Sequence, residues 1–174
     1  IQDSFDKEIS YFCPNDAQRM ANVKNEVGLL KAEVASFLND DMLKVQALDS
    51  YYRIVGNNKD YGDMYNAHNV DFLLSMDVEQ SAFKLAQKEV NNRPTPESYG
   101  WLAYSLLYLG EEQKAMEVIE KHVIGATYEP AILHQAAEIY KANGKKEKVS
   151  ELKQELMGAV YELGPVKEVQ IASL

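Results

Sequence analysis

The stretch LAYSLLYLGEEQKA, residues 102–115, places a glycine in the middle of a helical pattern of apolar residues. Glycine costs about 1 kcal/mol relative to alanine inside a helix, so Gly110 suits a turn better than the interior of one long helix. The stretch AAEIYKANGKKEKV, residues 136–149, has the same shape, with Gly144 in the same place 34 residues later. The two stretches predict two helix–turn–helix units, in which a residue with positive φ ends each first helix.

Apolar residues on both sides of these glycines recur at steps of three and four, which is the period of one helix face. Thr95 and Pro96 are typical of a helix start, because threonine caps free N–H groups and proline is tolerated in the first turn. No segment combines clean alternation with hairpin turn residues, so no strand is expected. The same pattern predicts turns within helix pairs near residues 40, 77, 110 and 144, and breaks between pairs near residues 14, 58, 94, 128 and 165.

The turns and breaks recur at intervals of about 33 to 37 residues, apart from the first break, and such a period is typical of stacked helix–turn–helix units. The third unit carries regularly spaced residues at Tyr99, Leu102, Ala103, Leu106, Ala115 and Ile119. The fourth carries them at Leu133, Ala136, Ala137, Tyr140, Val149 and Pro165. The second unit is a poorer match, with Asp77 in place of the glycine. At these positions the sequence resembles the tetratricopeptide repeats, most clearly over residues 62–165.

The resemblance implies an all-α fold, an α-solenoid of about four antiparallel helix–turn–helix repeats with right-handed superhelical stacking. The whole chain, residues 1–174, is then a single domain of this kind. Its expected parts are a half-repeat at 1–13, repeats at 15–57, 62–94, 95–128 and 129–165, and a C-terminal tail at 166–174. Two departures from the family pattern are Lys153, in an aromatic position, and His122, in a position usually held by a small residue.

The tail VKEVQIASL is apolar and follows a Gly-Pro stop at residues 164 and 165. Two interpretations stay open: the tail folds back on the last unit as a cap, or it pairs with another chain in a homodimer. The chain begins with Ile1 rather than methionine, which indicates a processed or trimmed piece of a longer protein. Localisation therefore cannot be read from this sequence.

Composition and motifs speak against several kinds of chemistry. The formal net charge of -9 opposes binding to phosphate backbones, so nucleic acid is not an expected partner. Cys13 is the single cysteine, and the three histidines, His68, His122 and His134, are not clustered with one another or with it. We expect no metal site, no cofactor and no catalytic residues. No run approaches 18 apolar residues, so no membrane span is expected.

In tetratricopeptide repeats the first helices line an inner groove. The resemblance places the following residues in that groove: Asp71, Ser75, Tyr104, Tyr108, His134, Glu138 and Lys141. Tyr104 and Tyr108 share one helix face, and two interpretations stay open for them. They are partly buried against the neighbouring unit, or they form a stacking and hydrogen-bonding surface for an extended peptide.

Chaperone-binding members of the family clamp a C-terminal carboxylate with basic groove residues. The corresponding places here hold Gly100, Trp101 and Tyr104 in one unit, and His134, Gln135 and Glu138 in the next. The positive charge is missing, which argues against a clamp for an acidic tail. An acidic domain with a tyrosine-lined groove would sooner accept a neutral or basic segment.

The predicted function is that of a non-catalytic module, not an enzyme, that binds a peptide segment or partner protein in its groove. The alternative is an accessory domain of a larger enzyme, such as a glycosyltransferase, or an assembly or lipoprotein factor. The start at Ile1 and the half-repeat before residue 14 motivate this alternative, because they imply that something precedes the chain. Part of either assignment rests on the family, because a fold does not fix a function.

Overall fold

The computed structural model describes residues 28–55 and 66–174, and all regular structure in these residues is helical. The predicted all-α class is therefore confirmed for this part of the chain, which contains no strand. The chain divides into two compact units, residues 1–60 and 61–174. This division falls between the first and second predicted repeats. The predicted half-repeat at 1–13 and Cys13 lie outside the described residues.

The described part of the first unit is a helical hairpin. Residues 28–37 are helical, and α3 follows at Asp41–Val55. Gly28 lies against α3, since a Cβ at this position would be 3.5 Å from Tyr51 Cβ. The buried side chains of the pair are mostly small: Ala32, Ala35, Ala47 and Tyr51. Larger apolar side chains are exposed instead, among them Leu30, Val34, Phe37, Leu38, Met42 and Val45.

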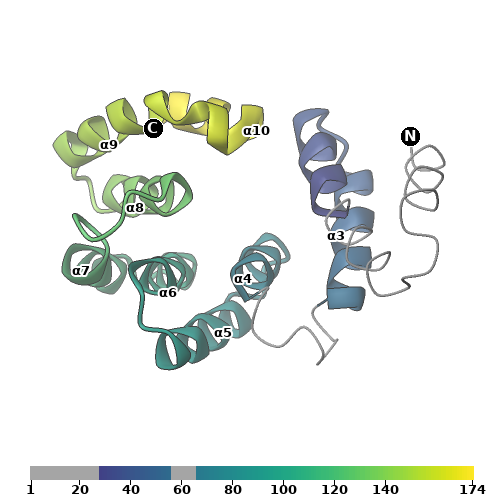
Figure 1. Cartoon of the computed structure of the whole chain (residues 1–174), viewed down its shortest axis with the longest axis horizontal. Helices are drawn as coiled ribbons and strands as arrows, with labels where there is room; N and C mark the ends of the chain where they lie inside the picture. The colour runs from purple at the N-terminus through teal and green to yellow at the C-terminus, as the bar shows by residue number, and fades with distance from the viewer. Residues whose placement is uncertain (1–27, 56–65) are drawn as a thin grey trace, which may run out of the picture. The chain divides into compact units, whose positions relative to one another are not determined.

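The second unit is a succession of helices in which each packs against the next in sequence. The bounds are α4 (Asn66–Ser75), α5 (Glu79–Asn92), α6 (Pro96–Tyr108), α7 (Glu112–His122), α8 (Pro130–Ala142), α9 (Lys146–Gly158) and α10 (Val160–Ala172). In addition, α4 contacts α6, α6 contacts α8, and α8 contacts α10. Figure 1 shows α4, α6, α8 and α10 following one another in that order, with α5, α7 and α9 packed along one side of them. We call α4, α6, α8 and α10 the even-helix row.

The turns within helix pairs share one backbone device. At Gly110 the φ angle is 75° and at Gly144 it is 67°. The Gly110 N–H donates to Leu107 O at 3.0 Å, and the Glu111 N–H donates to Leu106 O at 2.9 Å. This pair of hydrogen bonds is a Schellman motif, which satisfies the free carbonyl groups at a helix end. The predicted role of both glycines is confirmed.

The same motif recurs in the described residues without glycine, at Asn39 and Asp77, where φ is 55° in each case. The Asp77 N–H donates to Leu74 O at 3.2 Å, and the Val78 N–H donates to Leu73 O at 2.9 Å. Asn and Asp enter the left-handed region more readily than other side chains do. The turns predicted near residues 40, 77, 110 and 144 are thus four copies of one motif.

Gly110 and Gly158 offer a matched pair of substitutions to alanine. A Cβ at either position would meet nothing within 4 Å, so sterics with neighbours do not separate them. Gly110 has positive φ, whereas Gly158 ends α9 without it. We expect Gly110→Ala to lower the free energy of unfolding by about 1 kcal/mol, and Gly158→Ala to leave it unchanged or raise it by up to about 1 kcal/mol. Urea unfolding followed by circular dichroism measures both, and equal effects would contradict the turn assignment.

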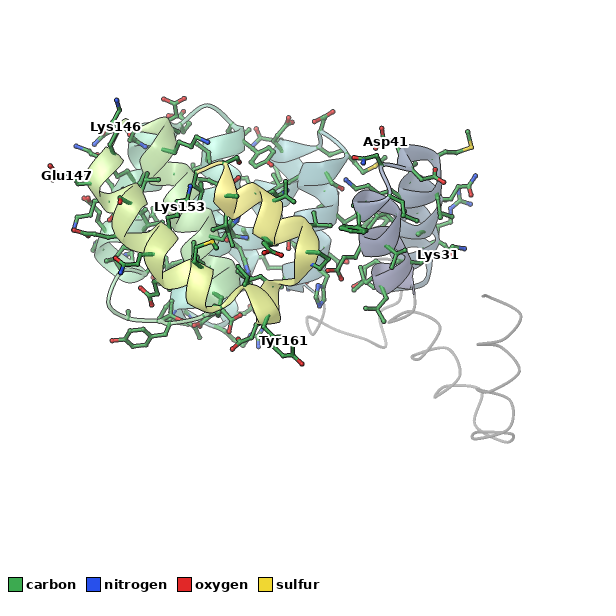
Figure 2. The ribbon with its side chains drawn as sticks, turned by 90° about the horizontal axis from the view of Figure 1, so that it is seen from above. Lys31, Asp41, Lys146, Glu147, Lys153 and Tyr161 are labelled. Atoms are coloured by element: carbon green, nitrogen blue, oxygen red, sulfur yellow. The ribbon has the colours of Figure 1, made fainter. Side chains whose placement is uncertain are left out.

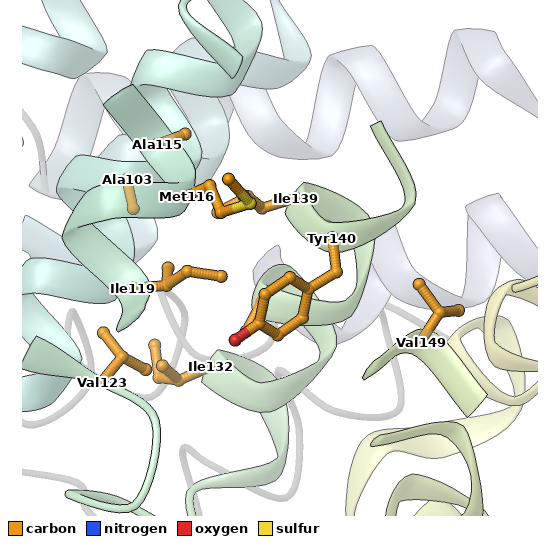
Figure 3. Packing of buried hydrophobic residues seen from close by; sticks show 10 residues of the cluster. Ala103, Ala115, Met116, Ile119, Val123, Ile132, Ile139, Tyr140 and Val149 are labelled. Atoms are coloured by element: carbon orange, nitrogen blue, oxygen red, sulfur yellow. The ribbon is translucent and has the colours of Figure 1, made fainter. Parts of the chain in front are cut away.

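The largest buried cluster of the second unit joins α6, α7, α8 and α9 (Figure 3). Its members are Ala103, Ala115, Met116, Ile119, Val123, Ile132, Ala136, Ile139, Tyr140 and Val149. Helices α6 and α8 approach each other closely, because a Cβ built on Gly100 would lie 2.7 Å from Ile132 Cγ2. The unusual His122 has a local partner, since its ring stacks on Tyr99 with centroids 3.8 Å apart. Small residues in the contact and this ring pair together hold α6 against its neighbours.

A buried carboxylate connects α4 to α5. The side chain of Glu89 on α5 is fully buried. Its Oε2 accepts a hydrogen bond from Asn66 Nδ2 at 2.6 Å, and its Oε1 accepts one from Arg93 Nε at 2.6 Å. Both oxygens of the charged group are therefore paired, as burial of a charge requires.

The helix boundaries near the C-terminus differ from the predicted ones. The fourth repeat was predicted to end at a break near residue 165, but its second helix, α9, ends at Gly158 and α10 begins at Val160. Gly164 interrupts α10 with φ of 79°, so the Gly-Pro pair kinks this helix instead of stopping it. The predicted tail is helical from there to Ala172 and packs on α8 and α9, with Ile171 fully buried. Within this chain the tail folds back as a cap.

Candidate functional site

A hydrogen bond between two helices of the even-helix row marks the candidate site. The Tyr104 hydroxyl on α6 donates to Glu138 Oε2 on α8 at 2.5 Å. These residues lie 34 apart, the same separation as Gly110 and Gly144. They occupy equivalent positions in successive helix pairs, so the helical period brings them together. The Glu138 side chain keeps 31% of its surface exposed.

Tyr108 extends this contact toward solvent. It lies one helical turn after Tyr104, and the two rings meet edge to face with centroids 5.1 Å apart. Tyr108 is 47% exposed, whereas Tyr104 is partly buried. Burial first, then the charge of Glu138 and the hydrogen bond to it, raises the pKa of Tyr104, so its hydroxyl stays a protonated donor. We call Tyr104, Tyr108 and Glu138 the Tyr–Glu cluster.

His134 lies one turn before Glu138 on α8, behind the cluster. Its side chain is fully buried, with Nδ1 3.8 Å from Glu138 Oε2. Neither ring nitrogen has a hydrogen-bond partner among the described residues. Burial lowers the pKa of His134 to about 4, Lys167 lowers it as well, and Glu138 opposes both. The imidazole is therefore neutral at pH 7.

Asp71 on α4 and Lys167 on α10 bring further charge to the row. The Asp71 side chain is exposed, but enough protein surrounds its carboxyl group to raise its pKa to about 6, while Lys167 lowers that pKa. Lys167 thus acts on both Asp71 and His134. Lys167 is not among the predicted groove residues because it falls in the segment predicted to be a tail, although the helical period of that segment could have indicated it.

The two remaining predicted residues are engaged elsewhere. Ser75 Oγ donates to Phe72 O of its own helix at 2.7 Å. Lys141 Nζ donates to Ser173 O at 2.9 Å. Lys153, which is labelled in Figure 2, donates from its Nζ to Ala172 O at 2.7 Å. These lysines satisfy free carbonyl groups at the C-terminal end of α10, where positive charge is favourable. Lys153, the departure in an aromatic position, therefore helps to hold the cap.

Of the seven predicted groove residues, the structure joins Tyr104, Tyr108, His134 and Glu138 by direct contacts. His134 is part of the cluster's buried support rather than of its surface. In residues 28–55 and 66–174, no group of three or more His, Cys, Asp or Glu side chains is placed to hold a metal ion. None of the helices described there has the length and apolar character needed to cross a bilayer.

Comparisons of the chain with protein-family models, curated proteins and solved structures gave no significant match.

Proposed function

We propose that this chain is a protein-binding module of the tetratricopeptide type, a right-handed α-solenoid of about four helix–turn–helix repeats. The repeated Schellman turns support this, because they end the first helix of each pair in the same way. The contacts of α4 with α6, α6 with α8, and α8 with α10 support stacked first helices. In such a stack, equivalent positions of successive repeats form one continuous surface.

We propose further that an extended segment of a protein partner binds along the even-helix row. The observation that carries this is the Tyr–Glu cluster, in which two successive pairs contribute to one half-exposed surface. Tyrosine offers a large contact area and a polar tip at a low cost in conformational entropy, which suits it to binding surfaces. The exposed ring of Tyr108 is the part of this cluster most accessible to a partner.

Selection from a random peptide display library on the full chain tests this function. Peptides that bind the row are expected to lose about tenfold in affinity when Tyr108→Ala removes the exposed ring. Tyr128→Ala is the matched control, because Tyr128 is 78% exposed and lies in the loop between α7 and α8, outside the row. Fluorescence anisotropy of the selected peptides measures both dissociation constants.

Trp101 is the one tryptophan of the sequence and lies in α6, so its fluorescence during urea unfolding reports on the second unit. The midpoint for Tyr108→Ala is expected to stay near the wild-type value. A large fall in this midpoint would assign Tyr108 to the core. If the affinity of the selected peptides is equally insensitive to Tyr108→Ala and to Tyr128→Ala, the proposed function is overturned.

A further inference from the structure

We infer that the Tyr–Glu cluster is a subsite for the positively charged side chain of a lysine or arginine in the bound segment. This inference rests on the proposed function and names the chemistry of its ligand. It differs from the carboxylate clamp of related folds in the sign of the charge that is recognised. Two features of the cluster carry it, the free oxygen of Glu138 and the exposed ring of Tyr108, together with the neutral histidine buried behind them.

Glu138 presents an incompletely paired carboxylate. Its Oε2 accepts from Tyr104, and no donor among the described residues reaches its Oε1. The side chain is 31% exposed, so an incoming group can contact it. Ammonium and guanidinium groups form charge-assisted hydrogen bonds with carboxylates, and these are stronger than bonds between neutral groups.

The neighbouring ring adds a second attraction of the same sign. Tyr104 meets Tyr108 edge to face, and the Tyr108 ring is 47% exposed. The face of an aromatic ring attracts a cation that lies within about 6 Å of its centroid. A lysine or arginine side chain that pairs with Glu138 would have both aromatic residues of the cluster beside it.

The buried support of the cluster favours the same ligand. His134 is fully buried with both ring nitrogens unpaired, and it lies 3.8 Å from the Glu138 carboxylate. As a neutral ring it adds no positive charge that would attract an anion. The net charge of -9 adds long-range attraction for a basic segment, which speeds association more than it fixes position.

Substitution of Lys167 tests whether the bound ligand is positively or negatively charged. It is the cation whose charge reaches both His134 on α8 and Asp71 on α4. A positive charge that acts on His134, one turn from Glu138, opposes a cationic ligand at Glu138 and would help an anionic one. Removing it with Lys167→Met is therefore expected to tighten binding of a basic peptide, and to weaken binding of an acidic peptide.

The experiment uses the full chain with fluorescein-labelled decalysine and decaglutamate as probes in fluorescence anisotropy. Glu138→Gln keeps the side-chain shape and an acceptor for Tyr104, and it is expected to raise the dissociation constant of decalysine about fivefold to tenfold. Glu155→Gln on α9 is the charge-matched control, because Glu155 is exposed outside the cluster. It is expected to change that constant less than twofold, and Lys167→Met is expected to lower it.

Equal weakening by Glu138→Gln and Glu155→Gln would overturn the inference, because it would mean general attraction to an acidic protein. Tighter binding of decaglutamate than of decalysine would overturn it as well. If the peptides from display selection depend on Tyr108 but lack lysine and arginine, the charge preference fails and the proposed function stands. If no selected peptide depends on Tyr108, the proposed function fails and this inference falls with it.

Discussion

Replacing Glu89 with alanine is expected to lower the free energy of unfolding of the second unit by about 2–4 kcal/mol. The fully buried carboxylate accepts hydrogen bonds from Asn66 on α4 and Arg93 at the end of α5. Its removal leaves a cavity and an Asn66 amide, itself only 4% exposed, without its acceptor. The exposed Arg93 can turn to solvent, so most of the cost falls on the α4–α5 contact.

Urea unfolding followed by Trp101 fluorescence measures this loss as a lower midpoint with an unchanged slope. Glu155→Ala is the matched control, since this exposed glutamate on α9 is expected to change the free energy by less than about 0.5 kcal/mol. If Glu89→Ala proved as mild as the control, the buried carboxylate would not be holding α4 to α5.

Replacing Ala103 with leucine is expected to destabilise the second unit by about 1–3 kcal/mol through overpacking. Ala103 is fully buried in the cluster that joins α6, α7, α8 and α9. The neighbouring contact of Gly100 with Ile132 already leaves no room for a Cβ, so α6 cannot move toward α8 to make space. A larger side chain at residue 103 therefore has to separate the helices or adopt a strained rotamer.

The comparison for Ala103→Leu is Ala131→Leu, which makes the same change at an exposed position of α8. We expect the control to alter the melting temperature little, because surface substitutions away from special features usually stay within about 0.5 kcal/mol. An unchanged melting temperature for Ala103→Leu would place this residue outside the helix contact.

The repeated turns show which backbone conformations can be predicted from the local sequence alone. Gly110 and Gly144 were predicted to take positive φ, because glycine is the residue that does so without a steric cost. Asp77 was recognised as a weaker version of the same turn, and the structure gives it the same pair of backbone hydrogen bonds. Asn39 carries no glycine signal, so the sequence placed its turn only near residue 40.

For the candidate site, the sequence predicted which positions are equivalent but not which side chains are in contact. The 34-residue period assigns Tyr104 and Glu138 to equivalent positions, and this follows from sequence spacing alone. That the hydroxyl of one donates to the carboxylate of the other depends on how closely α6 and α8 approach. The burial of His134 also depends on how closely α6 and α8 approach each other. His134 was expected on the groove surface, but it is fully buried behind the Tyr–Glu cluster. The place of Lys167 required the kink at Gly164 to redirect the last helix.

The sequence by itself determined the helical class, the turn positions and the faces that pack, because these follow from the period of apolar residues and from the φ preferences of single residues. Tertiary structure alone decided which side chains at those faces are partners. Glu89 accepts a hydrogen bond from Asn66, 23 residues earlier in the chain, and Lys141 and Lys153 donate to carbonyl groups at the end of α10. The distances between the helices and the kink in α10 determine these contacts, and no local sequence pattern does. Pairing between polar side chains needs atomic distances near 3 Å, and only the packed helices fix distances that closely.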